Sequence, residues 1–313
     1  MPALRPLRPT RADQQRFVDR ARETRELLAA ADGGRNALVL GAYGSGKSSL
    51  LAHAAYERRD APRRWVIVPG ETAATPAALL LRILTGLDQA AAERWEARLS
   101  TRARSADPLL EPALIAQLLD ELDERARETV LAIDGVAPGV AHALFGSARN
   151  EVWALGDTTW VVAGRLEERD LLLRPPADAF FEATIALDPL ADDDARALLE
   201  AAGEDPSDAV LRAGAGIPAQ LLRAAALARE GKAPARLAAA AAPASGTRAG
   251  LLGWLVARGS ASPSDPDLLE QLGVSRQRAA KLLAELADQG VVRATEERPE
   301  GTGRPRKRYT LTA

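Results

Sequence analysis

The chain has 313 residues, a length that corresponds to about two domains with a large core. Its formal net charge of −2 excludes a protein that is basic throughout, so any contact with nucleic acid has to be local. It contains no cysteine, which excludes disulfides, cysteine nucleophiles and thiolate metal sites and suits the reducing cytoplasm. Because no apolar run reaches the roughly 18–20 residues that span a bilayer, we expect a cytoplasmic protein without a membrane partner.

The chain starts with residues 1–11, which are rich in proline and arginine and predict an extended lead-in. Apolar residues then recur at helical spacing between positions 13 and 30, which predicts a helix there.

The most specific motif reads Gly-Ala-Tyr-Gly-Ser-Gly-Lys-Ser-Ser, at residues 41–49, and fits the phosphate-binding pattern G-x-x-x-x-G-K-[ST]. Residues 37–40 before it predict a buried strand, and residues 49–58 after it predict a helix. A strand, a glycine-rich turn and a helix start direct backbone N–H groups and the positive helix end at a polyphosphate. We therefore expect ATP, with Lys47 reaching the β- and γ-phosphates and Ser48 holding Mg²⁺. The residues predicted to bind nucleotide in this loop are Gly41, Gly44, Ser45, Gly46, Lys47, Ser48 and Ser49.

Further apolar runs predict the rest of a parallel sheet between helices, an α/β fold with five strands. The additional predicted strands are residues 65–69, 129–134, 158–165 and 183–187. Helices are predicted at 75–87, where Thr75 can cap the N-terminus, and at 109–127, whereas residues 90–107 predict nothing definite.

Asp134 ends the strand at 129–134. At the carboxyl end of a parallel strand beside the phosphate loop, its carboxylate is placed to reach the Mg²⁺ shell. The alternative is an aspartate that only caps the next turn.

Short helices are predicted at 192–202 and 206–213, and an alanine- and proline-rich stretch at 231–246 predicts a linker. A fresh pattern follows, with three helices at 248–257, 264–272 and 275–288 and two strands at 291–293 and 308–311. This order resembles a winged helix-turn-helix domain. The segment from Leu272 to Val292 matches its turn and third helix, in the pattern L-G-V-S-x-x-x-A-x-x-L-x-x-L-x-x-x-G-x-V.

Six motifs follow one another in an order that resembles AAA+ ATPases of the archaeal and eukaryotic initiator (origin-recognition) type and the related STAND signalling ATPases. They lie at residues 17–23, 41–49, 129–135, 158–165, 185–190 and 216–218. The resemblance implies a five-stranded AAA+-like core at 1–190, a helical lid at 191–232, a linker at 233–246 and a winged helix domain at 247–313. It also implies ATP between core and lid, so that the nucleotide could set the angle between them.

The same resemblance assigns roles to four residues outside the phosphate loop. Arg20, in a box that resembles F-V-G-R-x-x-E with Asp19 in place of glycine, and Pro218, in a G-x-P box, are implied to lie near the nucleotide. Arg165 ends the strand that resembles sensor 1 and is implied to sense the γ-phosphate, and Arg174 occupies the region of the arginine finger. The alternatives are an ordinary amphipathic helix around Arg20 and exposed loop arginines at 165 and 174.

One residue departs from the resemblance. Hydrolytic AAA+ proteins place a glutamate after the strand-ending aspartate, and this chain has Gly135 there. The catalytic set implied is Lys47, Asp134, Arg165 and Arg174. Without the glutamate, hydrolysis either fails, as in a nucleotide switch, or is slow, or needs a base from elsewhere in the chain.

The polar residues of the last domain predict a local contact with double-stranded DNA. Those at the start of the third helix could meet base edges and phosphates, and those of the strand hairpin could neutralise phosphates. They are Arg276, Gln277, Arg278 and Lys281 in the helix, and Arg304, Arg306, Lys307 and Arg308 in the hairpin. The alternative is a solvated helix face in a domain that binds protein.

We therefore expect an ATP-controlled protein that binds double-stranded DNA and assembles on it or loads a partner. The other hypothesis is a signalling or defence ATPase whose winged helix mediates protein interaction, with nucleotide governing self-association.

Overall fold

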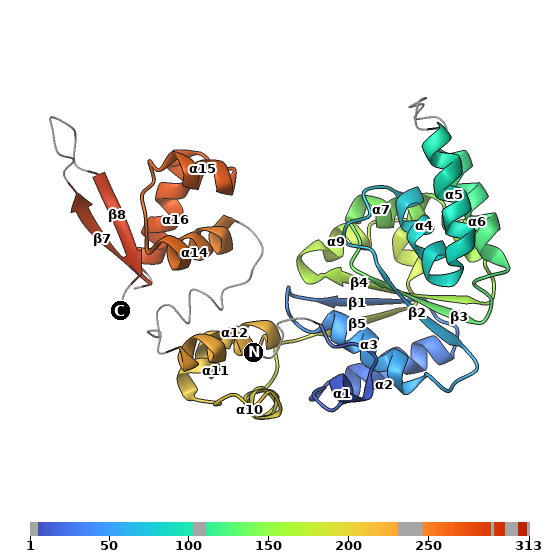
Figure 1. Ribbon diagram of the computed structural model, residues 1–313, viewed down its shortest axis with the longest axis horizontal. Coiled ribbons are helices and arrows are strands. Elements are labelled where there is room, and N and C mark those ends of the chain that lie inside the picture. Colours follow the sequence, from blue (N-terminus) through green and yellow to red (C-terminus); the bar gives the residue numbers. More distant parts are fainter. Residues whose placement is uncertain (1–5, 103–110, 231–246, 289–290, 298–305, 312–313) are drawn as a thin grey trace. The chain divides into compact units, whose positions relative to one another are not determined.

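The computed structural model describes residues 6–102, 111–230, 247–288, 291–297 and 306–311 (Figure 1). The chain divides into two compact units. One comprises Pro6–Ala42 and Gly46–Asp188, and the other comprises Tyr43–Ser45 with the described residues from Pro189 onward. The expected linker, residues 233–246, lies outside the described residues.

The first unit is built on a five-stranded, wholly parallel sheet in the order β2-β3-β4-β1-β5, which confirms the predicted fold class. Its strands are β1 (Ala37–Gly41), β2 (Arg64–Pro69), β3 (Thr129–Asp134), β4 (Thr158–Arg165) and β5 (Ala183–Leu187). The carboxyl ends of parallel strands lie at one edge of the sheet, so the residues that follow β1, β2, β3 and β4 gather there.

Alternation along the strands divides the core into two layers. In β1, Leu38 and Leu40 join the apolar cluster on one face, and Ala37 and Val39 join the cluster on the other. The first face is covered by α4 (Pro76–Leu87), α5 (Gln89–Arg102) and α6 (Glu111–Asp123), and the second by α2 (Ala21–Asp32) and α3 (Lys47–Glu57) (Figure 1). Helices on both faces explain why the strands read as continuous apolar runs. The shorter elements of this unit are α1 (Arg11–Gln14), α7 (Pro138–His142), η2 (Ala143–Ser147), α8 (Arg149–Trp153), η3 (Leu166–Glu168), α9 (Arg169–Leu172) and η4 (Ala177–Phe180).

The helix predicted for residues 13–30 is wrong in its first half. The structure has α1, then a break, and α2 begins only at Ala21. Asp19 and Arg20 have φ angles of 59° and 69°, in the left-handed region where a right-handed helix of L-residues cannot continue. The polar stretch after residue 88, for which the sequence predicted nothing definite, is helical as α5 and packs Trp95 into the core.

In the second unit, α10 (Asp192–Ala201), α11 (Asp208–Gly214) and α12 (Pro218–Arg229) pack around buried Leu199 and Leu221. Gly216, with φ of 70°, faces the segment at Leu190, whose N–H donates to the Gly216 carbonyl at 2.8 Å. A Cβ at position 216 would lie 2.5 Å from the Leu190 carbonyl oxygen, so this turn requires glycine.

The C-terminal elements are α14 (Thr247–Arg258), α15 (Pro266–Leu272), α16 (Arg276–Asp288) and an antiparallel sheet in the order β6-β8-β7. The strands are β6 (Ser260–Ala261), β7 (Val292–Glu297) and β8 (Arg306–Leu311). Leu251, Leu283 and Tyr309 share their apolar core. The hairpin strands are longer than predicted because cross-strand pairs extend to Glu297 and Arg306.

Two details of this region differ from what the sequence led us to expect. Strand β6 was not predicted, because two residues carry no period that the sequence could reveal. Helix α15 begins at Pro266 rather than after Ser264, because Asp265 is its N-cap residue. Among the helices that the structure describes, none is long and apolar enough to cross a membrane.

Candidate functional site

The phosphate loop connects β1 to α3. Gly44 and Gly46 have φ angles of 79° and 101°, which L side chains rarely adopt, so both positions need glycine. The Lys47 ammonium curls back and donates to the carbonyl oxygens of Gly41 and Ala42 at 2.8 and 2.9 Å. The positive charge of Lys47 is therefore held beside the loop that is predicted to bind phosphate.

Ser48 and Asp134 meet at the edge of the sheet. The Ser48 hydroxyl donates to Asp134 Oδ1 at 2.8 Å, joining the first turn of α3 to the end of β3. A hydroxyl and a carboxylate oxygen are ligands that suit Mg²⁺. Sequence analysis predicted both residues as metal ligands, and the structure brings them together.

Burial makes the charges of this site unfavourable on their own. It raises the pKa of Asp134, against the Ser48 hydrogen bond and the charge of Lys47, which lower it. It also lowers the pKa of Lys47, against the charge of Asp134, which raises it. A divalent cation beside Asp134 and a phosphate beside Lys47 would each stabilise the charged form, so these residues fit a nucleotide with its metal ion.

Arg165, the last residue of β4, forms an ion pair that sequence analysis missed. Its Nη2 donates to Glu71 Oε1 at 2.8 Å. This hydrogen bond raises the pKa of Arg165, so the guanidinium stays charged. Glu71 follows β2 after the Pro-Gly turn and belongs to no recognised motif, so nothing in the sequence marked it.

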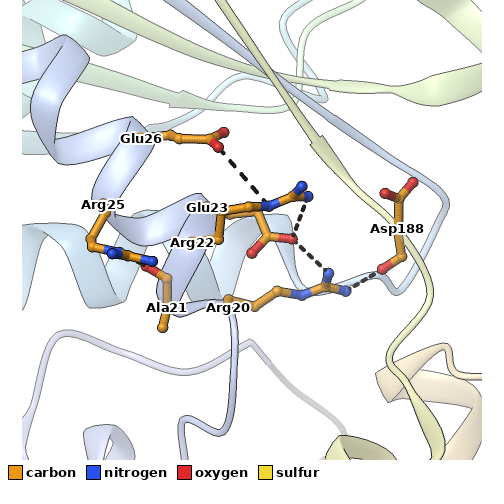
Figure 2. A network of polar contacts seen from close by, with 7 residues as sticks. All are labelled: Arg20, Ala21, Arg22, Glu23, Arg25, Glu26 and Asp188. Atoms are coloured by element: carbon orange, nitrogen blue, oxygen red, sulfur yellow. Dashed lines mark hydrogen bonds and ion pairs between the residues drawn. The ribbon is translucent and has the colours of Figure 1, made fainter.

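Arg20 lies in a buried polar network at the start of α2 (Figure 2). Its Nη1 donates to Glu23 Oε1 at 3.2 Å and its Nη2 to the Asp188 carbonyl oxygen at 2.6 Å. Arg22 and Glu26 continue the network at the surface, where Arg22 Nη2 lies 3.6 Å from Glu23. The structure thus gives Arg20, predicted as a nucleotide contact, a bond to the chain just after β5.

The remaining residues predicted around the nucleotide have varied surroundings. Ser49 Oγ accepts a hydrogen bond from the Leu7 N–H at 3.2 Å, so its hydroxyl binds the lead-in segment. Pro218 is the first residue of α12. Next to it, the Ala219 N–H donates to the Gly44 carbonyl oxygen at 3.2 Å, in the unit that includes Tyr43–Ser45. Arg174 is exposed after α9.

Six of the residues predicted to contact DNA are exposed in the part of the C-terminal elements that the structure describes. Helix α16 buries Ala279, Leu282, Leu283 and Leu286 in the core. Its residues predicted to contact DNA are exposed, and they are Arg276, Gln277, Arg278 and Lys281.

On β8, Lys307 and Arg308 are exposed, and Arg308 Nη1 donates to Ser260 Oγ at 3.1 Å. The strand register places Glu296 opposite Lys307 and Glu297 opposite Arg306, so each of these acidic positions of β7 pairs with a basic position of β8. Arg304 lies outside the described residues.

Comparison with known proteins gives one family match. Residues 16–155 match the family described as AAA ATPase domain. No curated protein matches the chain.

Among solved structures, the chain is similar to the Aeropyrum pernix Orc1 protein in complex with DNA, at 16% identity and a TM-score of 0.50, covering 94% of this chain and 89% of that one. It is also similar to Cdc6p from Pyrobaculum aerophilum, at 16% identity and a TM-score of 0.49, covering 99% and 92% of the two chains. A third similar structure is the Thermotoga maritima RuvB Holliday junction branch migration motor, at 18% identity and a TM-score of 0.44, covering 99% and 95%. At 16% identity the likeness to the Orc1 structure concerns the fold alone.

Proposed function

We propose that this chain, whose residues 16–155 match the AAA ATPase domain family and whose fold is similar to that of the Aeropyrum pernix Orc1 protein, is an ATP- and Mg²⁺-dependent switch protein that binds double-stranded DNA. In this proposal residues 1–190 are the ATPase core, 191–232 the lid, 233–246 the linker and 247–313 a winged helix domain.

The bond between Ser48 and Asp134, with Lys47 beside it, is the observation that carries the nucleotide part. Three groups from β1–α3 and β3 converge, and burial disfavours the charges of Lys47 and Asp134 unless counter-charges arrive. A nucleoside triphosphate supplies the anionic phosphates and its Mg²⁺ supplies the cation. When bound, this ion would neutralise charge on the phosphates that react.

Two observations support the DNA part. Three helices followed by a strand hairpin agree with the element order of a winged helix, and α16 exposes Arg276, Arg278 and Lys281 near its N-terminus. The similar Orc1 structure is a complex with DNA. The start of a recognition helix is where base edges and phosphates are contacted.

Fluorescence anisotropy of a labelled duplex, titrated between 50 and 200 mM salt, tests this assignment. Five exposed cations on α16 and β8 would give a slope of log affinity against log salt near −4.5, because each phosphate contact contributes about −0.9. The affinity would then fall roughly 500-fold over this fourfold range of salt. Binding that is undetectable, or insensitive to salt with ATP and with ADP, contradicts the DNA part.

The second candidate is a STAND-like signalling or defence ATPase, whose C-terminal domain binds protein. The pairing of Glu296 with Lys307 and of Glu297 with Arg306 in the hairpin register favours it, because acidic residues reduce the net positive charge of the hairpin. Mass measurements with ADP and with an ATP analogue, each with and without duplex, separate the two. Oligomers that depend on nucleotide and ignore DNA support the second candidate.

A further inference from the structure

The loops after β2 and β3 are in close contact at the carboxyl edge of the sheet. Register pairs Pro69 with Asp134, and the Gly70 N–H donates to the Asp134 carbonyl oxygen at 3.0 Å. A Cβ at Gly70 would lie 2.2 Å from the Gly135 carbonyl oxygen, so only glycine permits this approach. The next residue, Glu71, is thereby brought beside Gly135.

This backbone leaves no place for the glutamate that hydrolytic AAA+ proteins carry after the strand-ending aspartate. Gly135 has φ of 79°, which strains any L side chain, and a Cβ there would lie 3.0 Å from Glu71 Cβ. The space beside position 135 is occupied by the stem of another glutamate.

The carboxylate of Glu71 is held across the end of β3. Because β3 lies between β2 and β4 in the sheet, the ion pair from Glu71 to Arg165, at the end of β4, passes over the carboxyl end of β3, where Asp134 lies. Burial lowers the pKa of Lys47 and raises that of Asp134, and the charge of Glu71 raises both pKa values. Glu71 is therefore within electrostatic range of both residues.

We propose that Glu71 supplies the carboxylate that orients and deprotonates the attacking water in ATP hydrolysis, in place of the residue missing at 135, with Arg165 as its positioning residue. This inference depends on the proposed binding of ATP. The water oxygen forms a bond to the γ-phosphorus, and the bond from that phosphorus to the β,γ-bridging oxygen breaks. ADP leaves with the electron pair, and the water proton passes to Glu71. The Glu71 side chain is 65% exposed, so it can return this proton to solvent.

The test compares Glu71→Gln with the wild type in the full chain, with two readouts: affinity for a fluorescent ATP analogue in Mg²⁺, and phosphate release from ATP. We expect turnover to fall about 10²–10⁴-fold, the usual contribution of general base catalysis, while affinity changes less than about threefold. Arg165→Met should lower turnover as well.

Glu167→Gln is the matched control. Glu167 is also an exposed carboxylate just after β4, and its charge raises the pKa of Lys47 against burial and that of Arg165. Among the described residues, however, the hydrogen bond and ion pair of Arg165 go to Glu71 and not to Glu167. Phosphate release from ATP by Glu167→Gln should stay at the wild-type rate. Similar losses in Glu71→Gln and Glu167→Gln would show an effect of net charge alone and overturn the inference.

The remaining outcomes separate the inference from the proposed function. ATP binding with equal turnover in Glu71→Gln and wild type overturns the role of Glu71 only. ATP binding with no turnover in the wild type does the same, since no hydrolysis then needs a base. Failure of the wild type to bind ATP overturns the proposed function, and the inference with it.

Discussion

Replacement of Arg20 by methionine should destabilise the ATPase core strongly, although Arg20 lies in a short loop segment before α2. The side chains of Arg20 and Glu23 are only 7% and 8% exposed, and Arg20 also binds the Asp188 carbonyl at 2.6 Å. Removing one partner of a buried ion pair costs about 3–5 kcal/mol because the other charge stays desolvated. Two lost hydrogen bonds that involve a charged group, at about 1.5–3 kcal/mol each, give a similar sum.

Arg22, the other cation near Glu23, should not compensate for this loss of stability. Arg22 approaches Glu23 at 3.6 Å, but its side chain is 64% exposed, so the pair contributes only about 0–1 kcal/mol. Arg22→Met is therefore a matched control: it makes the same chemical change two positions along the chain, at a cation that lies near the same Glu23 carboxylate.

Urea unfolding followed by circular dichroism and tryptophan fluorescence measures both variants. We expect Arg20→Met to lower the free energy of unfolding by about 4 kcal/mol, which for a unit of this size corresponds to a fall in Tm of roughly 8–16 °C, and Arg22→Met to lower it by less than about 1 kcal/mol. A double variant that also carries Glu23→Met should lose less than the sum of the single losses, because no charge is left buried. Equal, small losses in Arg20→Met and Arg22→Met would refute the reasoning.

Three further predictions concern the nucleotide and DNA sites. ATP at 100 times its Kd should stabilise the wild type by about 2.7 kcal/mol in thermal unfolding and leave Lys47→Ala unchanged, and an equal shift in both would contradict the role of Lys47. Burial raises the pKa of Asp134, so the folded protein holds this proton more tightly than the unfolded chain and loses stability as pH rises from about 4 to the raised pKa. In metal-free buffer the stability difference between Asp134→Asn and wild type should therefore shift toward the variant over that window, and a difference independent of pH would exclude this linkage. Lys281→Ala should reduce the magnitude of the salt slope of DNA binding by about 0.9. The control Arg25→Ala, which removes an exposed cation of α2, should leave the slope unchanged. Equal slopes in Lys281→Ala and the wild type would show that Lys281 contacts no phosphate.

The phosphate loop and the strands could be predicted because their signals are local. Residues 41–49 are contiguous, and the apolar runs at 129–134 and 158–165 became β3 and β4 with the predicted bounds. Thr75 was predicted to cap α4, and its hydroxyl accepts a hydrogen bond from the Ala78 N–H at 3.1 Å. Each of these features depends on the properties of neighbouring residues.

The break before α2 could not be predicted in the same way. The apolar spacing around Phe17 fits a helix, but Arg20 takes a left-handed conformation and its guanidinium binds Asp188, 168 positions away. Local helical preference is weak, a few tenths of a kcal/mol per residue, and a buried tertiary contact of several kcal/mol overrides it.

The sequence by itself predicted the phosphate loop and the parallel sheet, and it named Ser48 and Asp134 as expected metal ligands. Only the tertiary structure decided what lies around them. Strand order brings Glu71 from β2 and Arg165 from β4, 94 positions apart, to a 2.8 Å contact over the end of β3, next to the glycine at 135. The physical reason is that a motif records spacing along the chain, whereas the chemistry at a sheet edge depends on which strands lie side by side.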